Sequence, residues 1–124
     1  MIFPKFSWGD DWKELRKFEK LDEHESAIVF YAENKASMNH FKTLIFELTE
    51  KMDLEICYVT SVKDDPMLTL QNLKIQSFYI GDGTARTKFF LTLKARILIM
   101  DMPDIEKFHI KRSKIYPVHY IYVF

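Results

Sequence analysis

The sequence predicts an α/β fold: a Rossmann-like parallel sheet of five strands in the order 3-2-1-4-5, with helices on both faces and a preceding N-terminal helix. Short, continuously apolar runs recur along the chain, as is typical of strands that are covered on both faces. Segments with a helical period of apolar residues separate several of these runs, and such crossovers join parallel strands with a right-handed connection. At 124 residues, of which 48% are hydrophobic, the chain is long enough for one core and too short for two.

The first 26 residues are expected to form an amphipathic helix and a polar hinge, ahead of a Rossmann-like domain over residues 27–124. Ser7 is placed as the N-cap, because a serine side chain accepts hydrogen bonds from free backbone N–H groups of the first turn. Large apolar residues then recur at steps of three and four: Trp8, Trp12, Leu15 and Phe18. This stripe predicts packing on the protein itself, or contact with a membrane surface through neighbouring lysines. The acidic residues interspersed with those lysines favour packing.

The remaining elements follow from the same patterns. Apolar runs predict strands over residues 27–32, 55–60, 75–80, 96–100 and 119–124. Helical periodicity predicts a helix over residues 37–52, with one face formed by Met38, Phe41, Leu44 or Ile45, Leu48 and Met52. A further helix is predicted over residues 84–94, and a short helical turn is expected over residues 104–109. Glu47 and Lys51 are spaced for an i,i+4 ion pair.

The chain stops inside its last apolar run. A terminal carboxylate at the end of a central parallel strand would be buried without a partner, which is costly. We therefore expect Phe124 to be a cut point and the domain to be half of a larger enzyme. The exposed end of the sheet and the aromatic stripe of the first helix then predict association into a homo-oligomer.

Several kinds of site are excluded by the residues present. Cys57 is the single cysteine, so no intrachain disulfide can form, and the four histidines lack metal-ligand spacing, so no metal is predicted. A dinucleotide fingerprint belongs after the first strand, where Glu33-Asn34-Lys35 contains no glycine, and no cofactor is expected. The chain has no signal-peptide pattern at its start and no apolar run near the roughly 20 residues of a membrane span. A cytoplasmic protein is predicted, associated at most with a membrane surface and without a nucleic-acid partner.

In an open parallel sheet, ligands bind beyond the carboxyl ends of the strands, near the point where the strand order reverses. This rule selects polar positions after successive strands: Glu33, Ser61 with Asp65, Gly81 and Asp101. The segment Gly81-Asp82-Gly83-Thr84 opens a helix, so it either receives a phosphate on its backbone N–H groups or is an ordinary tight turn. Asp64 and Asp65 are candidates for a base or a cation ligand, with an Asp-Asp-Pro turn as the alternative.

Basic residues gather toward the end of the chain. Residues 83–124 carry eight basic and three acidic side chains, whereas residues 1–82 are net acidic. Lys111 and Arg112 lie in the densest basic run and are candidate phosphate ligands, because arginine can bind a phosphate with two parallel hydrogen bonds. Arg86 and Lys88 are expected to assist them. The alternative is an ordinary solvated surface.

Six segments together resemble the N-terminal half of CDP-glycerol glycerophosphotransferase-like proteins, the family of teichoic-acid primases and polymerases. They are residues 29–35, 58–61, 64–66, 79–83, 101–103 and 110–113, in the family's order and spacing. Asn34 stands where the family usually has glycine, and Met102 stands where a threonine before proline is more usual. The likeness covers about residues 24–124.

The resemblance implies a GT-B architecture, in which two Rossmann-like halves face each other across a cleft. In such enzymes the C-terminal half holds the nucleotide donor and the N-terminal half shapes the acceptor side. The implied function is transfer of glycerol phosphate, or a related phospho-polyol or sugar, from a CDP-activated donor at the inner membrane face. The family's catalytic histidine loop would follow Phe124, so the chain alone is expected to be inactive. Two alternatives stay open: a binding or scaffold module without chemistry, and a flavodoxin- or receiver-like signalling domain.

Overall fold

The computed structural model describes residues 9–101 and 112–123. Its strands are β1 (Ile28–Ala32), β2 (Ile56–Thr60), β3 (Ile75–Tyr79), β4 (Ile97–Met100) and β5 (His119–Tyr122). Its α-helices are α1 (Asp10–Glu19), α2 (Ser37–Phe46) and α3 (Thr84–Thr92). A π-helical turn, Glu47–Lys51, continues α2, and a 3₁₀ turn, Pro66–Thr69, lies between β2 and β3.

The strands form one sheet in the order β3-β2-β1-β4-β5, and every neighbouring pair is parallel, which confirms the predicted fold class. β1 lies at the centre, where Phe30 stands opposite Tyr58 on one side and Ile99 on the other. The residues from Val29 to Ala32 have no solvent exposure. A strand that is buried on both faces does not alternate between apolar and polar residues. A continuous apolar run in the sequence was therefore sufficient to predict β1.

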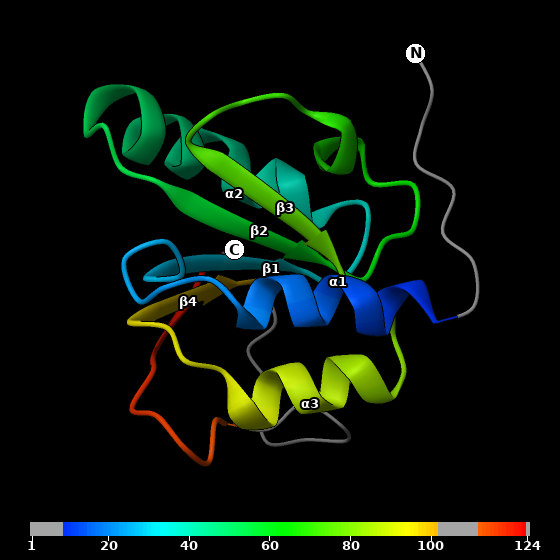
Figure 1. Cartoon of the computed structure of the whole chain (residues 1–124). Coiled ribbons are helices and arrows are strands. Elements are labelled where there is room, and N and C mark those ends of the chain that lie inside the picture. Colours follow the sequence, from blue (N-terminus) through cyan, green and yellow to red (C-terminus); the bar gives the residue numbers. More distant parts are fainter. Residues whose placement is uncertain (1–8, 102–111, 124) are drawn as a thin grey trace.

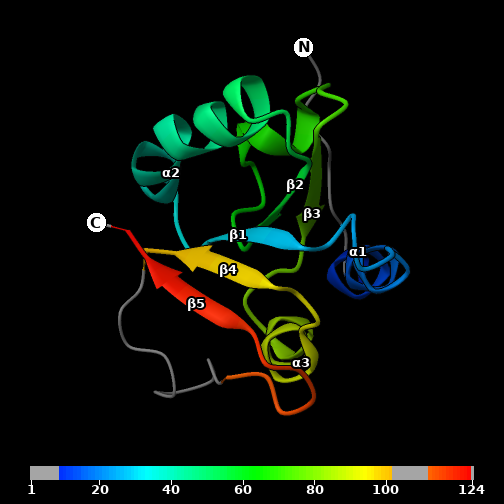
Figure 2. The same ribbon diagram turned by 90° about the vertical axis from the view of Figure 1, so that its left-hand side faces the viewer.

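Helices α1 and α3 cover one face of the sheet, and α2 covers the other (Figure 1 and Figure 2). Successive side chains of a strand point to opposite faces, so Tyr31 and Val59 pack in the layer of α1 and α3. Phe30 and Tyr58 pack in the layer of α2. The core therefore consists of two apolar layers with the sheet between them, and all five carboxyl ends lie along one edge.

Helix α1 packs against the domain through two buried residues, Leu15 and Phe18. The Phe18 ring meets Phe78 of β3 and Phe89 of α3 edge-on, at centroid distances of 5.6 and 5.4 Å. Leu15 and Phe18, which belong to the predicted apolar stripe, therefore pack on the protein itself. The N-cap of the helix is Gly9, with φ of 90° and no side-chain hydrogen bond, so the prediction of Ser7 as the N-cap is wrong. Ser7 and Trp8 lie outside the described residues.

The prediction that Met52 shares the buried face of the second helix is wrong. Phe41 and Ile45 are buried as expected, but the turn after α2 is π-helical, and it shifts the angular position of every later side chain. Met52 is consequently 61% exposed. The predicted pair of Glu47 and Lys51 does form, at 3.0 Å.

In the part of the chain that the structure describes, no helix combines the length and apolar character needed to cross a bilayer. The helical turn expected over residues 104–109 and the predicted ligand Lys111 fall outside that part.

Candidate functional site at the carboxyl end of the sheet

The strand order reverses between β1 and β4. From β1 the chain proceeds through α2 to β2 and β3 on one side, and it then returns through α3 to β4 on the other. The carboxyl ends of β1 and β4 therefore flank the position where doubly wound folds bind ligands. The polar residues predicted for this edge divide into two groups, one on each face of the sheet.

The group on the face of α3 is built around a buried arginine. Arg86, in the first turn of α3, is 4% exposed at its side chain, and its Nη1 donates to Glu33 Oε1 at 2.9 Å and to Oε2 at 3.2 Å. Its Nη2 donates to the carbonyl of Asp82 at 3.0 Å. Arg86 was expected as a surface ligand for phosphate, and this expectation is wrong because the guanidinium is sequestered by Glu33. Lys88, expected beside it, pairs with Glu19 at 3.1 Å.

Tyr31 connects this ion pair to the neighbouring strands. Its hydroxyl donates to Glu33 Oε2 and lies 2.6 Å from Ser61 Oγ, which in turn donates to the carbonyl of Gly81 at 2.5 Å. Burial and the adjacent carboxylate of Glu33 raise the pKa of Tyr31 far above its ordinary value. The phenol therefore stays protonated and acts as a hydrogen-bond donor. Glu33, Ser61 and Gly81 are thus brought together, as the carboxyl-end rule predicted.

Gly81 owes its identity to two local constraints. Its φ is 66°, a conformation that side chains with a Cβ rarely adopt. A Cβ at this position would also lie 3.1 Å from Asp11 Oδ2 of α1. The turn from Gly81 to Thr84 is therefore structurally required, and this supports the tight-turn interpretation of that segment.

The group on the face of α2 centres on Asp65, which is 5% exposed. Its Oδ2 accepts hydrogen bonds from the Tyr58 hydroxyl at 3.0 Å and the Thr60 hydroxyl at 2.9 Å. Its Oδ1 accepts from the backbone N–H of Met67 at 3.0 Å and so caps the 3₁₀ turn. Burial, and then the charge of Asp65, raise the pKa of Tyr58. Asp65 is therefore a fixed structural acceptor, as its turn motif indicated.

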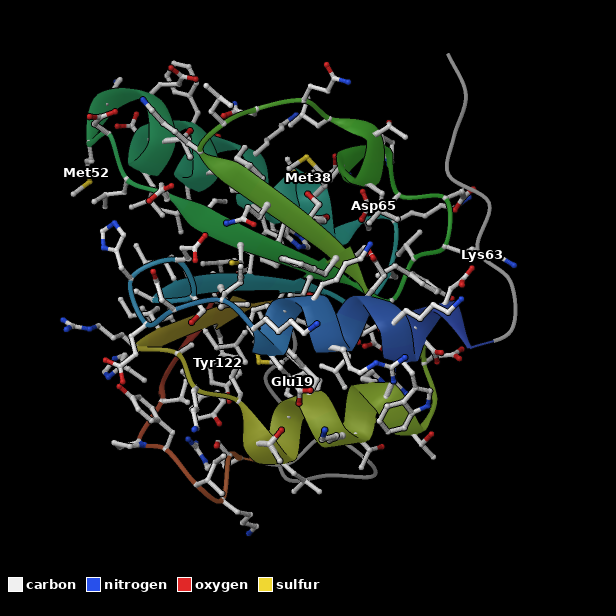
Figure 3. The ribbon with its side chains drawn as sticks, in the orientation of Figure 1. Glu19, Met38, Met52, Lys63, Asp65 and Tyr122 are labelled. Atoms are coloured by element: carbon white, nitrogen blue, oxygen red, sulfur yellow. The ribbon has the colours of Figure 1, made fainter. Side chains whose placement is uncertain are left out.

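A cavity of about 400 Å³ opens beside Asp65, between the start of α2 and the loop after β2. Its lining residues are Lys35, Met38, Val62, Asp64, Asp65, Pro66 and Met67. Figure 3 shows Met38 and Asp65 near each other on the α2 side, with Met52 at the far end and Lys63 pointing away from the protein. Lys35 Nζ and Asp64 Oδ2 form an exposed ion pair at 3.1 Å, and this hydrogen bond to Lys35 lowers the pKa of Asp64. The cavity thus combines an apolar wall, a cation and two carboxylates.

A histidine that the sequence did not single out lies at the same edge. His40 Nδ1 is 3.0 Å from Asp101 Oδ2, which joins the second turn of α2 to the residue that follows β4. Asp101 is 8% exposed at its side chain and His40 is 40% exposed. The carboxyl-end rule selected Asp101 but could not select His40. A helix contacts the edge through its first turns, and strand ends alone do not indicate which of its residues reach that edge.

Arg112 does not join these groups. Its guanidinium lies over the ring of Tyr120, 4.8 Å from the centroid. The adjoining Ser113 and Lys114 bond to the carbonyls of Leu93 and Leu91, at the end of α3 that is distant from Gly81. The described part of the basic run is therefore placed at the opposite end of the helix from Glu33 and Ser61.

No protein family, characterised protein or solved structure matches this chain. Among the described residues, no group of three or more His, Cys, Asp and Glu side chains is placed to hold a metal ion.

Proposed function

We propose that this chain is the acceptor-side domain of a transferase that moves glycerol phosphate, or a related phospho-polyol or sugar, from a CDP-activated donor. The observation that carries the proposal is the cavity at the carboxyl ends of β1 and β2, with Lys35 on its wall. Rossmann-like domains bind ligands at this edge. The sequence resemblance supplies the substrate class, and the cavity supplies a place for its acceptor.

Lys35 is the group that suits the phosphate of such an acceptor. A lysine ammonium binds phosphate as a point charge, and its present partner, Asp64, is 62% exposed. Solvent-exposed ion pairs of this kind contribute little stability, so a phosphate with more negative charge can replace Asp64 as the partner of Lys35. Asp64 is then released to accept a ligand hydroxyl.

Glu33 suits the hydroxyl groups of a polyol. An ionised carboxylate offers about four positions for hydrogen-bond donors, and Arg86 and Tyr31 fill three of those of Glu33. The carboxylate is 26% exposed at the same edge of the sheet, although it does not line the cavity, so we propose that an acceptor which extends beyond the cavity contacts it. Since Arg86 and Tyr31 hold the carboxylate rigidly, little entropy is lost when it binds.

Donor binding and transfer require a second half in this proposal. Donor and acceptor must be held in near-attack contact for the reaction to proceed, and a single acceptor-side domain supplies one of the two surfaces. The proposed location is cytoplasmic, at the inner face of the membrane. We expect the chain alone to show no turnover of CDP-glycerol.

Calorimetric titration of the full chain with glycerol 3-phosphate tests the proposal. The matched variants are Lys35→Ala, at the cavity, and Lys63→Ala, which removes the same charge from a side chain that points away. We expect Lys35→Ala to weaken binding about tenfold, as is typical of a hydrogen bond to a charged group. Lys63→Ala should leave binding unchanged. Absence of binding, or equal weakening by both variants, would remove the support that the cavity gives to the proposal.

A further inference from the structure

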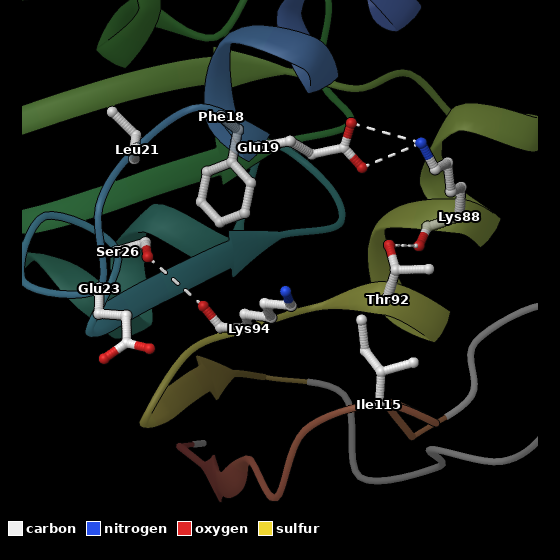
Figure 4. A pocket seen from close by; sticks show the side chains of 9 residues that line it. All are labelled: Phe18, Glu19, Leu21, Glu23, Ser26, Lys88, Thr92, Lys94 and Ile115. Atoms are coloured by element: carbon white, nitrogen blue, oxygen red, sulfur yellow. Dashed lines mark hydrogen bonds and ion pairs between the residues drawn. The ribbon is translucent and has the colours of Figure 1, made fainter.

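We propose that the hollow between the ends of α1 and α3 is a second ligand site, and that it binds a small apolar monocarboxylate such as an aromatic acid. Figure 4 shows the side chains that line it, which come from the end of α1, the turn before β1, the end of α3 and the segment before β5. The hollow lies at the end of α3 that is distant from Gly81. The inference therefore goes beyond the proposed function and does not depend on it.

Lys94 supplies the charge that such a ligand needs. It follows Leu93, the C-cap of α3. In the described part of the chain, no carboxylate forms an ion pair with its ammonium. Figure 4 shows the ammonium pointing into the space between the Phe18 ring and Ile115, whereas Lys63 points away from the protein in Figure 3. An ammonium in this position can donate a charge-assisted hydrogen bond to an anion inside the hollow.

The other side-chain donors of the hollow already have protein acceptors. Lys88 pairs with Glu19 at 3.1 Å. The Thr92 hydroxyl donates to the carbonyl of Lys88 at 2.8 Å, and the Ser26 hydroxyl donates to a carbonyl of the turn after α1 at 3.0 Å. Lys94 is therefore the single side-chain donor of the described lining that is left for a ligand.

The charge of the lining favours a carboxylate over a phosphate. The lining contains two lysines and two glutamates, and Lys88 with Glu19 forms a balanced pair. A phosphate monoester has three strong acceptor oxygens and a charge of about −1.5 to −2 at pH 7. With Lys94 as its one donor, a phosphate would keep part of that charge unpaired beside Glu19 and Glu23. A carboxylate carries a single charge, which Lys94 matches.

The apolar part of the lining fits one ring or a short chain. It consists of Phe18, Leu21 and Ile115, and Ile115 is 55% exposed, so a ligand that covers it removes apolar surface from water. The Phe18 ring is held by edge-on contacts with Phe78 and Phe89, so this wall is already in place before a ligand binds. An apolar cavity of about 150 Å³ is sufficient for benzene, and the volume of about 260 Å³ here accommodates a ring together with its carboxylate.

Backbone amide NMR titration of the full chain with three probes tests the site. The probes are benzoate, benzyl alcohol, which has the ring without the charge, and acetate, which has the charge without the ring. Benzoate should cause saturable shifts in residues 18–26, 88–94 and 115. It should bind at least about tenfold more tightly than either of the other probes, because each of them lacks one of the two contacts. Glycerol 3-phosphate should leave these amides unchanged.

Three variants separate the two contacts. Lys94→Met keeps the length and apolar stem of the side chain but removes the charge, so it should weaken benzoate binding about tenfold and leave benzyl alcohol binding unchanged. Ile115→Ser should weaken the binding of both ring compounds about three- to tenfold. Lys63→Met, the matched control, should change neither. Lys94, Ile115 and Lys63 are all exposed, so each variant should unfold at the same temperature as the unaltered chain.

Several results would overturn the proposal. Equal affinities for benzoate and benzyl alcohol, or an unchanged affinity of Lys94→Met for benzoate, would show that the hollow does not recognise a carboxylate. Acetate that binds as tightly as benzoate would show that the lysine acts without the hollow. Benzoate shifts that centre on the carboxyl edge of the sheet would place the ligand elsewhere. Each of these results leaves the proposed function standing, whereas absence of glycerol 3-phosphate binding contradicts the proposed function and not this site.

Discussion

The two ends of the sheet carry similar kinds of residues under different degrees of burial. At the carboxyl end, Arg86, Asp65 and Asp101 are each at most 8% exposed. At the amino end, the pair of His24 and Glu55 lies in solvent. A desolvated charge must keep its partners, so its position is fixed, whereas an exposed charge can exchange its partner for water. Burial of the charged side chains therefore distinguishes the rigid polar edge at the carboxyl end from ordinary charged surface at the amino end.

The volume of a cavity alone does not distinguish the carboxyl end of the sheet from the amino end. A hollow of about 570 Å³ lies at the amino end beside His24, Glu55 and Arg96, and it is larger than the cavity at the carboxyl end. A second hollow, of about 260 Å³, lies between the ends of α1 and α3 (Figure 4). Its polar lining includes the ion pair of Glu19 and Lys88, whose side chains are 33% and 44% exposed. Neither hollow has a buried charged group in its lining.

The largest contrast is expected between two ion pairs that both involve α3. Glu33→Ala leaves the guanidinium of Arg86 buried without its carboxylate, and breaking a buried pair in this way costs about 3–5 kcal/mol of the free energy of unfolding. Glu19→Ala removes the partner of the exposed Lys88 and should cost less than about 1 kcal/mol. Urea unfolding of both variants measures the difference. Similar losses in the two variants would contradict the contrast between buried and exposed pairs.

A smaller contrast is expected between adjacent aspartates. Asp65→Ala removes the cap of the 3₁₀ turn and leaves the hydroxyls of Tyr58 and Thr60 without their acceptor. The two effects together should lower the free energy of unfolding by about 2–3 kcal/mol. Asp64→Ala, one residue earlier and exposed, should leave the unfolding midpoint nearly unchanged. If the Asp64 variant were the less stable of the two, the role of Asp65 as a buried acceptor would be wrong.

The buried tyrosines predict a fall in stability at alkaline pH. Burial, with Glu33 beside Tyr31 and Asp65 beside Tyr58, raises the pKa of both hydroxyls above the ordinary value of 10.0. Above pH 10 the unfolded chain loses these protons while the folded protein retains them, so the free energy of unfolding falls as pH rises. The expected loss is about 1 kcal/mol for each tyrosine near pH 11.

Chemical unfolding at about pH 9 and about pH 11 measures this loss, and Tyr31→Phe should reduce it. The phenolate absorbance of the folded protein should show these two side chains ionising only as the protein unfolds. A stability that is constant over this range would show that the hydroxyls titrate normally and are not held by the carboxylates.

The sequence was sufficient for the parts of the fold that are set by local pattern. The apolar runs located β1 and β2 because strands buried on both faces are apolar throughout, and the switch from α3 to β4 followed from a change of period. The angular position of Met52 around the helix could not be predicted, because no clear sequence pattern indicates a π-helical turn. The strand ends placed Glu33, Ser61, Gly81 and Asp101 at one edge, because parallel strands end together.

What the sequence could not provide were partners that are distant along the chain. Arg86 is read as a surface residue because arginine is rarely buried without a partner, and its partner Glu33 lies 53 residues away. Tyr31 lies within an apolar run, and a pattern of hydrophobicity does not indicate that its hydroxyl forms hydrogen bonds. His40 and Asp101 are separated by 61 residues, and only the folded sheet places them in contact.

The most direct test of a functional carboxyl edge is a backbone amide NMR titration of the full chain with glycerol 3-phosphate. The edge described here predicts shifts that concentrate in residues 33–40 and 61–67, with residues 23–27, 54–55 and 94–96 at the amino end unchanged. The shifts should saturate, and they should weaken as salt rises, since the phosphate contact with Lys35 is exposed to screening. Shifts that concentrate at the amino end or around Arg112 and Lys114 would contradict the carboxyl edge as the site, as would no shifts at all.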